Sequence, residues 1–314
     1  MISRFLKASG LFLLLAALLL LVPKAAAQSD NVATDKEKPE DAKNALKRKK
    51  THFENGNQAM KGAQAIRQQL QAAANDQRPA LLAKMKANYQ TAITEYQQAL
   101  QDTEVKDENG VHVIGLIGVI RNGLVSKQKA VDMLVQDKDL PVILSNLGMA
   151  YSGAEEYQDA ITMLQQAVIL KPAATTYMEL GTDLAQVGKT PEATATCDKI
   201  LTADSAAKGL QAGCLRNIAI ALTNKGKAVE AVTPLQRATQ RNPQDALAWK
   251  LLGDALSSTM TTKSEDSKIV YVIPSGTVEA YQKYLEFQPN GPYAAQVKAA
   301  LEALAQMTKR GSTP

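Results

Sequence analysis

Histidine and cysteine, which often take part in catalysis or metal binding, are few in this sequence. The chain has two histidines, His52 and His112, and two cysteines, Cys197 and Cys214. Neither histidine has a cysteine or a second histidine at the spacing of a metal site. No serine or cysteine forms a recognisable catalytic motif with either histidine. The glycines do not form a phosphate-binding loop. We therefore expect no enzyme activity, no metal and no cofactor.

The N-terminus has the order of a secretory signal peptide. Arg4 and Lys7 form a short positive region, residues 11–22 are an unbroken apolar run, and the small residues 25–27 precede Gln28. This order predicts export and removal of residues 1–27. The apolar run is shorter than the roughly 20 residues that span a membrane. We expect a periplasmic or secreted protein, with an uncleaved N-terminal membrane anchor as the alternative.

The charge balance argues against a nucleic-acid partner. The whole chain has a net charge of +5, and three of these charges lie in residues 1–27, which leaves +2 on the mature chain. The one marked basic run is residues 47–50, and acidic residues precede it at Glu37, Glu40 and Asp41. We interpret this run as a solvated helix face, with contact to an anionic lipid or polymer surface as the alternative.

Composition and breaker residues predict an all-α protein. Hydrophobic residues make up 45 % of the chain but aromatic residues only 4 %, so the core must be built mainly from small and aliphatic side chains. Such a core suits closely packed helices better than a sheet. Residues 39–74 have no proline after Pro39, residues 81–101 have none, and the two stretches flank a turn at 75–79, which predicts a long helical hairpin.

The middle of the chain repeats one pattern of residue types. From Leu147 and Gly148, apolar residues stand three, twelve, sixteen and nineteen positions after the glycine, and Pro172 stands 24 after it. The spacing places one apolar set on a first helix and the other on a second helix, which ends at the proline. The same offsets give Leu184, Ala193, Cys197 and Ile200; then Leu222, Ala231, Leu235, Ala238 and Pro243; then, after an insertion, Leu256, Ala280, Tyr284 and Phe287.

This pattern resembles the tetratricopeptide repeat (TPR), whose period is about 34 residues. Trp249, Leu252 and Gly253 carry the resemblance in one copy, and Leu147 to Pro172 carry it in another. The resemblance implies an α-solenoid of stacked antiparallel helix pairs with a concave groove that binds proteins or peptides. The expected organisation is a signal peptide (1–27), a disordered leader (28–38), the helical hairpin (39–102), a degenerate repeat (111–140), repeats at 141–173, 174–207, 212–245 and 246–292, the last with an inserted loop (260–275), and a capping helix (293–309).

The first helix of each repeat lines the groove in proteins of this kind, so the resemblance implies which residues bind. The outward positions are mostly polar and nearly neutral, which suits hydrogen bonding to an extended chain. The predicted partner-binding residues are Ser145, Asn146, Met149, Glu179, Thr182, Arg216, Asn217, Ile220, Asn224, Lys250 and Asp254.

The two cysteines lie on helices that should pack against each other. Cys197 falls on the second helix of one repeat and Cys214 near the start of the next helix. Export to an oxidising compartment motivates a disulfide between them. The alternative is two buried thiols that pack as small apolar side chains.

These observations predict a non-catalytic scaffold of the cell envelope that holds a protein or peptide of unknown identity in the TPR groove. The alternative is a module that binds a non-protein envelope ligand such as a cell-wall polymer. The exposed side of the helical hairpin could also pair with a second copy, so self-association stays open. The inserted segment 260–275 contains an apolar, β-prone run at 268–274, which could pair with a partner strand or fold over the last repeats.

Overall fold

The structure is a computed structural model, and it describes residues 39–101, 104–107, 110–113, 138–265 and 268–311. The expected signal peptide and leader lie outside these residues. Within the described ranges no helix is long and apolar enough to cross a membrane. The chain divides into two compact units, residues 1–172 and 173–314, which are described one at a time.

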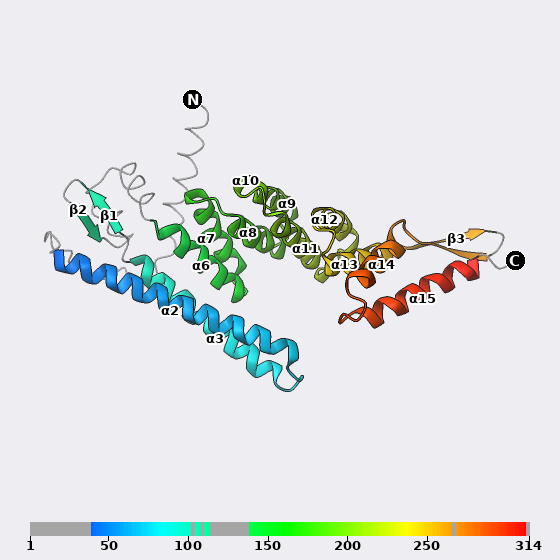
Figure 1. The fold of residues 1–314 in the computed structure, drawn as a ribbon, viewed down its shortest axis with the longest axis horizontal. Coiled ribbons are helices and arrows are strands. Elements are labelled where there is room, and N and C mark those ends of the chain that lie inside the picture. Colours follow the sequence, from blue (N-terminus) through cyan, green and yellow to red (C-terminus); the bar gives the residue numbers. More distant parts are fainter. Residues whose placement is uncertain (1–38, 102–103, 108–109, 114–137, 266–267, 312–314) are drawn as a thin grey trace, which may run out of the picture. The chain divides into compact units, whose positions relative to one another are not determined.

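Unit 1 begins with the helical hairpin, formed by α2 (Pro39–Ala72) and α3 (Arg78–Gln101) (Figure 1). Small residues on α2 let the two helices approach closely. A Cβ atom on Gly56 would lie 2.5 Å from the Tyr96 ring, so a glycine is needed where this large side chain crosses the interface. Tyr96 itself is completely buried.

The next helix pair, α6 (Leu140–Gly153) and α7 (Tyr157–Leu170), packs directly against the hairpin. The Tyr89 ring of α3 lies where a side chain on Gly153 would be, and the Gln97 amide donates to the Tyr151 hydroxyl at 2.8 Å. The helical hairpin therefore stacks on α6 and α7 as a helix pair of the same array.

One expectation in unit 1 is corrected. Residues 110–113, where a degenerate repeat was expected to begin, form strand β2 (Gly110–Val113) instead of a helix. This strand pairs antiparallel with β1 (Glu104–Asp107). The valines Val111 and Val113 favour extended backbone, which the helical interpretation of this stretch overlooked. The remainder of that expected repeat, residues 114–137, lies outside the described residues.

Unit 2 is a further series of antiparallel helix pairs. Its helices are α8 (Ala174–Gln186), α9 (Thr190–Asp198), α10 (Ile200–Ala203), α11 (Lys208–Asn224), α12 (Ala228–Arg241), α13 (Ala246–Ser257), α14 (Thr277–Phe287) and α15 (Ala294–Gly311). The expected all-α class, with stacked helix pairs of the α-solenoid type, is confirmed.

The repeated small residues explain how these pairs pack. A Cβ atom on Gly181 would lie 2.7 Å from Cys214 Sγ, and one on Gly253 would lie 2.6 Å from the Tyr281 ring. The turns between paired helices use left-handed backbone at Gly188 and Gly226, with φ of +87° and +72°, a conformation that glycine adopts without steric cost. Spacing and turn chemistry thus specify the same helix pairs.

The inserted segment was expected to be a loop, but it contains two strands. β3 (Thr261–Glu265) and β4 (Lys268–Val272) form an antiparallel ribbon between α13 and α14. After α14, the last helix α15 buries Val297 and Leu304 against the cluster that contains Tyr281 and Tyr284. The helix therefore covers the apolar side of the final pair, as a capping helix does.

Candidate functional site

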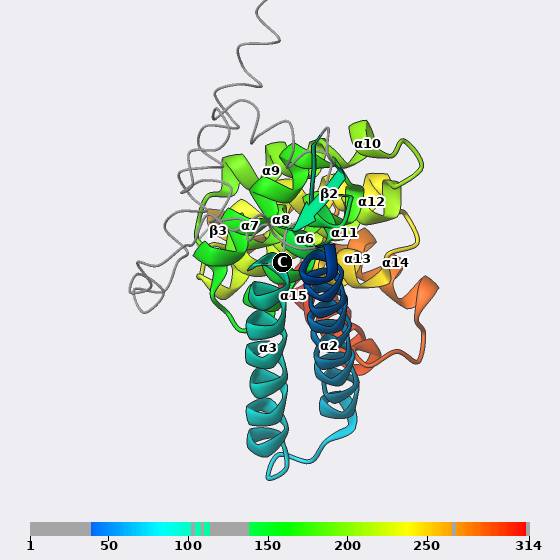
Figure 2. The ribbon, with the colours of Figure 1, turned by 90° about the vertical axis from the view of Figure 1, so that its left-hand side faces the viewer.

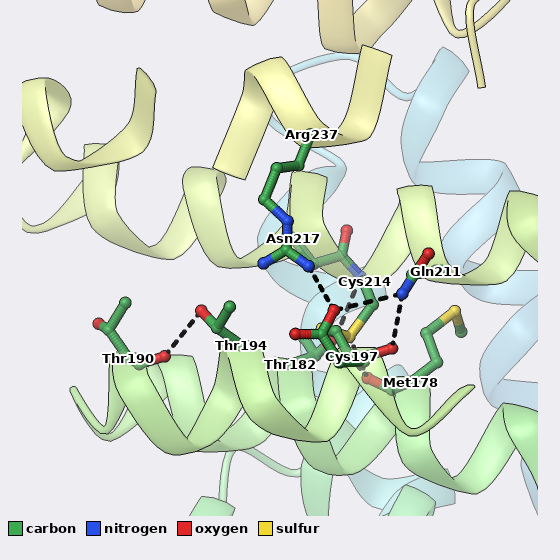
Figure 3. Close-up of a disulfide and its surroundings, with 10 residues drawn as sticks. Met178, Thr182, Thr190, Thr194, Cys197, Gln211, Cys214, Asn217 and Arg237 are labelled. Carbon is green, nitrogen blue, oxygen red and sulfur yellow. Dashed lines mark hydrogen bonds and ion pairs between the residues drawn. A yellow bond between two sulfur atoms is a disulfide. The ribbon is translucent and has the colours of Figure 1, made fainter. Parts of the chain in front are cut away.

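The predicted partner-binding positions of unit 2 lie on the first helices α8, α11 and α13, and we call their outward side the first-helix face. At its centre, the Asn217 amide of α11 donates to the Thr182 hydroxyl of α8 at 3.2 Å (Figure 3). The Thr182 hydroxyl in turn donates to the Met178 carbonyl at 2.9 Å. Both side chains are half-buried. This chain of bonds fixes the direction of the Asn217 amide, and its carbonyl oxygen accepts no bond among the described residues.

Arg216 lies beside Asn217 on the same helix, and its charge is neutralised. Its guanidinium forms an ion pair with Asp245, the residue before α13. The other carboxylate oxygen of Asp245 accepts from the Ala248 backbone N–H at 3.1 Å, so Asp245 also caps the N-terminus of α13. Arg216 Nε is buried and has no hydrogen-bond partner among the described residues. The pair holds the guanidinium in place at the edge of the face.

Lys250 and Asp254 form a second neutral pair on α13. Lys250 Nζ lies 2.6 Å from the Asp254 carboxylate and 4.8 Å from the centre of the Tyr293 ring. The Tyr281 hydroxyl donates to the same carboxylate at 3.0 Å. Burial, with the negative charge of Asp254 beside it, raises the pKa of Tyr281 to about 12. The hydroxyl therefore stays protonated and keeps donating at physiological pH.

The remaining predicted residues of unit 2 differ in how much of each side chain is exposed to solvent. Ile220 and Glu179 are half-buried, and Asn224 is exposed at the end of α11. The next residue, Lys225, donates to the Ala185 and Gln186 carbonyls at 3.1 and 2.7 Å, which satisfies the C-terminus of α8. The first-helix face is thus polar, its Arg216 and Lys250 are paired with carboxylates, and Ile220 offers an apolar contact.

The three predicted residues of unit 1 lie in a different setting. The Asn146 amide donates to the Asn57 side-chain oxygen of α2 at 3.0 Å, and the Tyr96 hydroxyl donates to that oxygen at 2.8 Å. The helical hairpin therefore uses one N–H of the Asn146 amide. Ser145 and Met149 are half-buried on the same helix.

A disulfide lies behind the first-helix face. Cys197 of α9 and Cys214 of α11 are bonded, with their Cα atoms 5.8 Å apart, and both are fully buried. The Gln211 amide, one turn before Cys214, donates to the Cys197 carbonyl at 3.4 Å (Figure 3). The bond therefore links the second helix of one pair to the first helix of the next, one turn from Asn217.

Three side chains that complete the site were not predicted. Asp245 could have been found as a helix cap, because it precedes an apolar helical run. Tyr281 and Tyr293 lie after the inserted segment and carried no local signal of contact with α13. Within the described ranges no cluster of His, Cys, Asp and Glu is arranged to hold a metal ion.

Comparisons with known proteins agree with this architecture. A tetratricopeptide-repeat family model matches residues 142–171, which span α6 and α7. No curated protein matches the sequence. The prediction of a TPR protein is confirmed, since residues 142–171 match the family model.

Several solved structures are similar at low sequence identity. A crystal structure of MamA matches with a TM-score of 0.41 and 15 % identity, over 77 % of this chain and 95 % of that one. YrrB, described as a TPR protein with an unusual peptide-binding site, matches with 0.37 and 16 %, over 76 % and 99 %. The C-terminal part of a TPR repeat-containing protein from Cytophaga hutchinsonii matches with 0.41 and 14 %, over 86 % and 91 %.

Proposed function

We propose that the chain is a non-catalytic scaffold of the cell envelope, which binds an extended segment of a partner protein on the first-helix face of unit 2. The observation that carries this proposal is the Thr182–Asn217 pair. A hydrogen bond fixes the amide of Asn217, and its carbonyl oxygen is left to accept from a partner backbone N–H. A side chain fixed in this way loses little conformational entropy when a partner binds.

The charges of the face support the same proposal. Arg216 is paired with Asp245, and Lys250 is paired with Asp254, so the face presents little net charge to a partner. Selection would then depend on hydrogen bonds and on apolar contact at Ile220. The location in the envelope is supported by the signal-peptide order of residues 1–27.

Site-specific photo-crosslinking in the native envelope tests the binding face. A crosslinking amino acid replaces Ile220 on the face in one variant, and Val229, which is 64 % exposed on the second helix α12, in the control. We expect a discrete protein adduct from position 220 that is absent from position 229. Adding Asn217→Ala should reduce this adduct several-fold, whereas Gln236→Ala on the exposed side of α12 should leave it unchanged.

Two results would contradict the proposal. Equal adducts from positions 220 and 229 would show that the face is not selective. An adduct from position 220 that is indifferent to Asn217→Ala would remove the role given to the fixed amide, provided that circular dichroism shows both variants folded.

A further inference from the structure

The distal half of the helical hairpin is a basic surface that the scaffold function does not use. We call residues 61–88 the hairpin tip. Gly62 of α2 lies level with Asn88 of α3, since a Cβ on Gly62 would lie 3.2 Å from that side chain. Near the turn, the Arg78 guanidinium donates to the Leu70 carbonyl at 2.8 Å. At 1.5 Å per residue, the tip is therefore a two-helix rod about 16 Å long.

The charge of this rod is almost entirely positive. Between Glu54 and Glu95 the sequence has five basic residues and a single acidic one, Asp76 in the turn. All five bases are exposed: Lys61, Arg67, Arg78, Lys84 and Lys86.

The lysines of the tip are not neutralised by their surroundings. No ion pair joins Lys61, Lys84 or Lys86 to a carboxylate within the described part of the chain. The two arginines donate to the hairpin itself, Arg67 to the Tyr89 hydroxyl and Arg78 to the Leu70 carbonyl, and these bonds hold their charges at the surface. The rest of the mature chain carries no positive excess, because outside residues 61–88 it has 28 basic and 30 acidic residues.

The tip also extends beyond the helices that cover the rest of the hairpin. The polar contacts of α3 with α6 and the loop after it involve Gln90 and Gln97, and Tyr89 covers Gly153. In Figure 2 the hairpin continues past α6 and α7 and ends in its turn. Leu82, on the part that continues, is 48 % exposed.

The exposed leucine lies between two cations. Arg78, Leu82 and Lys86 are four residues apart and share one face of α3. Long basic side chains can keep their charged ends among lipid phosphates while an apolar neighbour enters the boundary with the acyl chains. The tyrosines of the hairpin that could stack on a sugar ring, Tyr89 and Tyr96, are instead buried within unit 1.

From this geometry we propose that the hairpin tip binds the surface of a phospholipid bilayer rich in anionic headgroups. Leu82 enters the interface between Arg78 and Lys86, whose charged ends contact the headgroup phosphates, and Lys61 and Lys84 add to the positive potential around the tip. A bilayer suits the tip better than a folded partner or a sugar polymer, because an exposed leucine lies between two cations on one face and no described aromatic side chain is open there for stacking. The contact is independent of partner binding on the first-helix face.

Vesicle flotation with the chain from Gln28 onward tests the proposal, since this chain keeps every described residue and lacks the apolar N-terminal run. The vesicles are phosphatidylglycerol and phosphatidylcholine in equal parts, with pure phosphatidylcholine as the comparison. We expect binding to the anionic vesicles alone. The binding should be lost between 0.1 and 1 M NaCl, as the screening length falls from about 10 to about 3 Å.

Matched variants locate the contact. Lys61→Gln, Lys84→Gln and Lys86→Gln together should weaken binding roughly a hundredfold, at about fivefold for each lysine near an anionic surface. The control replaces three exposed lysines elsewhere, Lys171, Lys199 and Lys298, by Gln, which gives the same net charge. The control should bind like the parent, and Leu82→Gln should weaken binding several-fold without changing its salt dependence.

Three outcomes would overturn the proposal. They are no binding to the anionic vesicles, equal weakening in the tip variant and the control, and tight binding to soluble poly-L-glutamate without binding to vesicles. The last would identify the tip as a site for an acidic polymer.

Discussion

Breaking the Cys197–Cys214 bond should destabilise unit 2 without unfolding it. The bond closes a loop with a sequence separation of 17. In the chain-entropy model, a loop of this length restricts the unfolded chain by about 3 kcal/mol at 25 °C. Loss of the bond should therefore lower the melting temperature by roughly 6–12 °C, at about 2–4 °C per kcal/mol for a unit of this size.

The assay distinguishes the effect of the covalent S–S bond on stability from the effect of the two sulfur atoms. Melting is followed by circular dichroism for the oxidised chain, for the same chain reduced in mild denaturant and returned to buffer with reductant, and for a Cys197→Ala, Cys214→Ala variant. The reduced chain keeps both sulfurs, so its difference from the oxidised chain measures the cross-link alone. Alkylation and intact mass report the state of the bond. Identical melting of the oxidised and the verifiably reduced chain would refute the entropic reasoning.

Three further predictions rest on single contacts. Gly253→Ala should cost about 1–3 kcal/mol of unfolding free energy through overpacking against Tyr281, whereas Gly209→Ala, where an added Cβ meets nothing within 4 Å, should be neutral or stabilising in urea titrations. Asp245→Ala should lower the free energy of unfolding by about 1–3 kcal/mol, because it removes a helix cap and leaves the Arg216 guanidinium without its carboxylate. Asp245→Asn keeps the cap and should recover part of this loss in the same titrations. Burial raises the pKa of Tyr281 from 10.0 to about 12, so its contribution to stability is complete below pH 10 and is lost as pH rises through 12. Tyrosinate absorbance monitors its ionisation, and a free energy of unfolding that did not fall between pH 10 and 12 would contradict the assignment.

The sequence predicted what depends on local spacing. The glycine and the apolar residues after it recur at fixed offsets, and each offset has a local physical meaning in one helix or in one pair. The family match at residues 142–171 falls on a copy that has both the glycine, Gly148, and apolar residues at the four offsets after it. A helix pair is encoded within about 34 residues, so a single sequence is enough to identify it.

The sequence did not predict contacts between distant segments. Asn146, which was assigned to partner binding from its offset, also donates to Asn57, 89 residues earlier. Tyr281 reaches Asp254 across the inserted segment. Such contacts depend on which pairs stack on each other, and that information is not present in the repeat pattern. Residues 111–113 were wrongly assigned to a helical repeat, because the preference of Val111 and Val113 for extended backbone was overlooked.

The distribution of charge separates the two surfaces of this protein. On the first-helix face, both cations are satisfied by carboxylates of the same unit, so binding there should change little with salt. At the hairpin tip, three lysines have no carboxylate partner among the described residues, so binding there should weaken strongly as salt is raised. If both proposals hold, 1 M NaCl releases the chain from anionic vesicles while the adduct at position 220 still forms. A single shared surface would lose both contacts together, so this one titration tests whether the scaffold and the bilayer contact are separate.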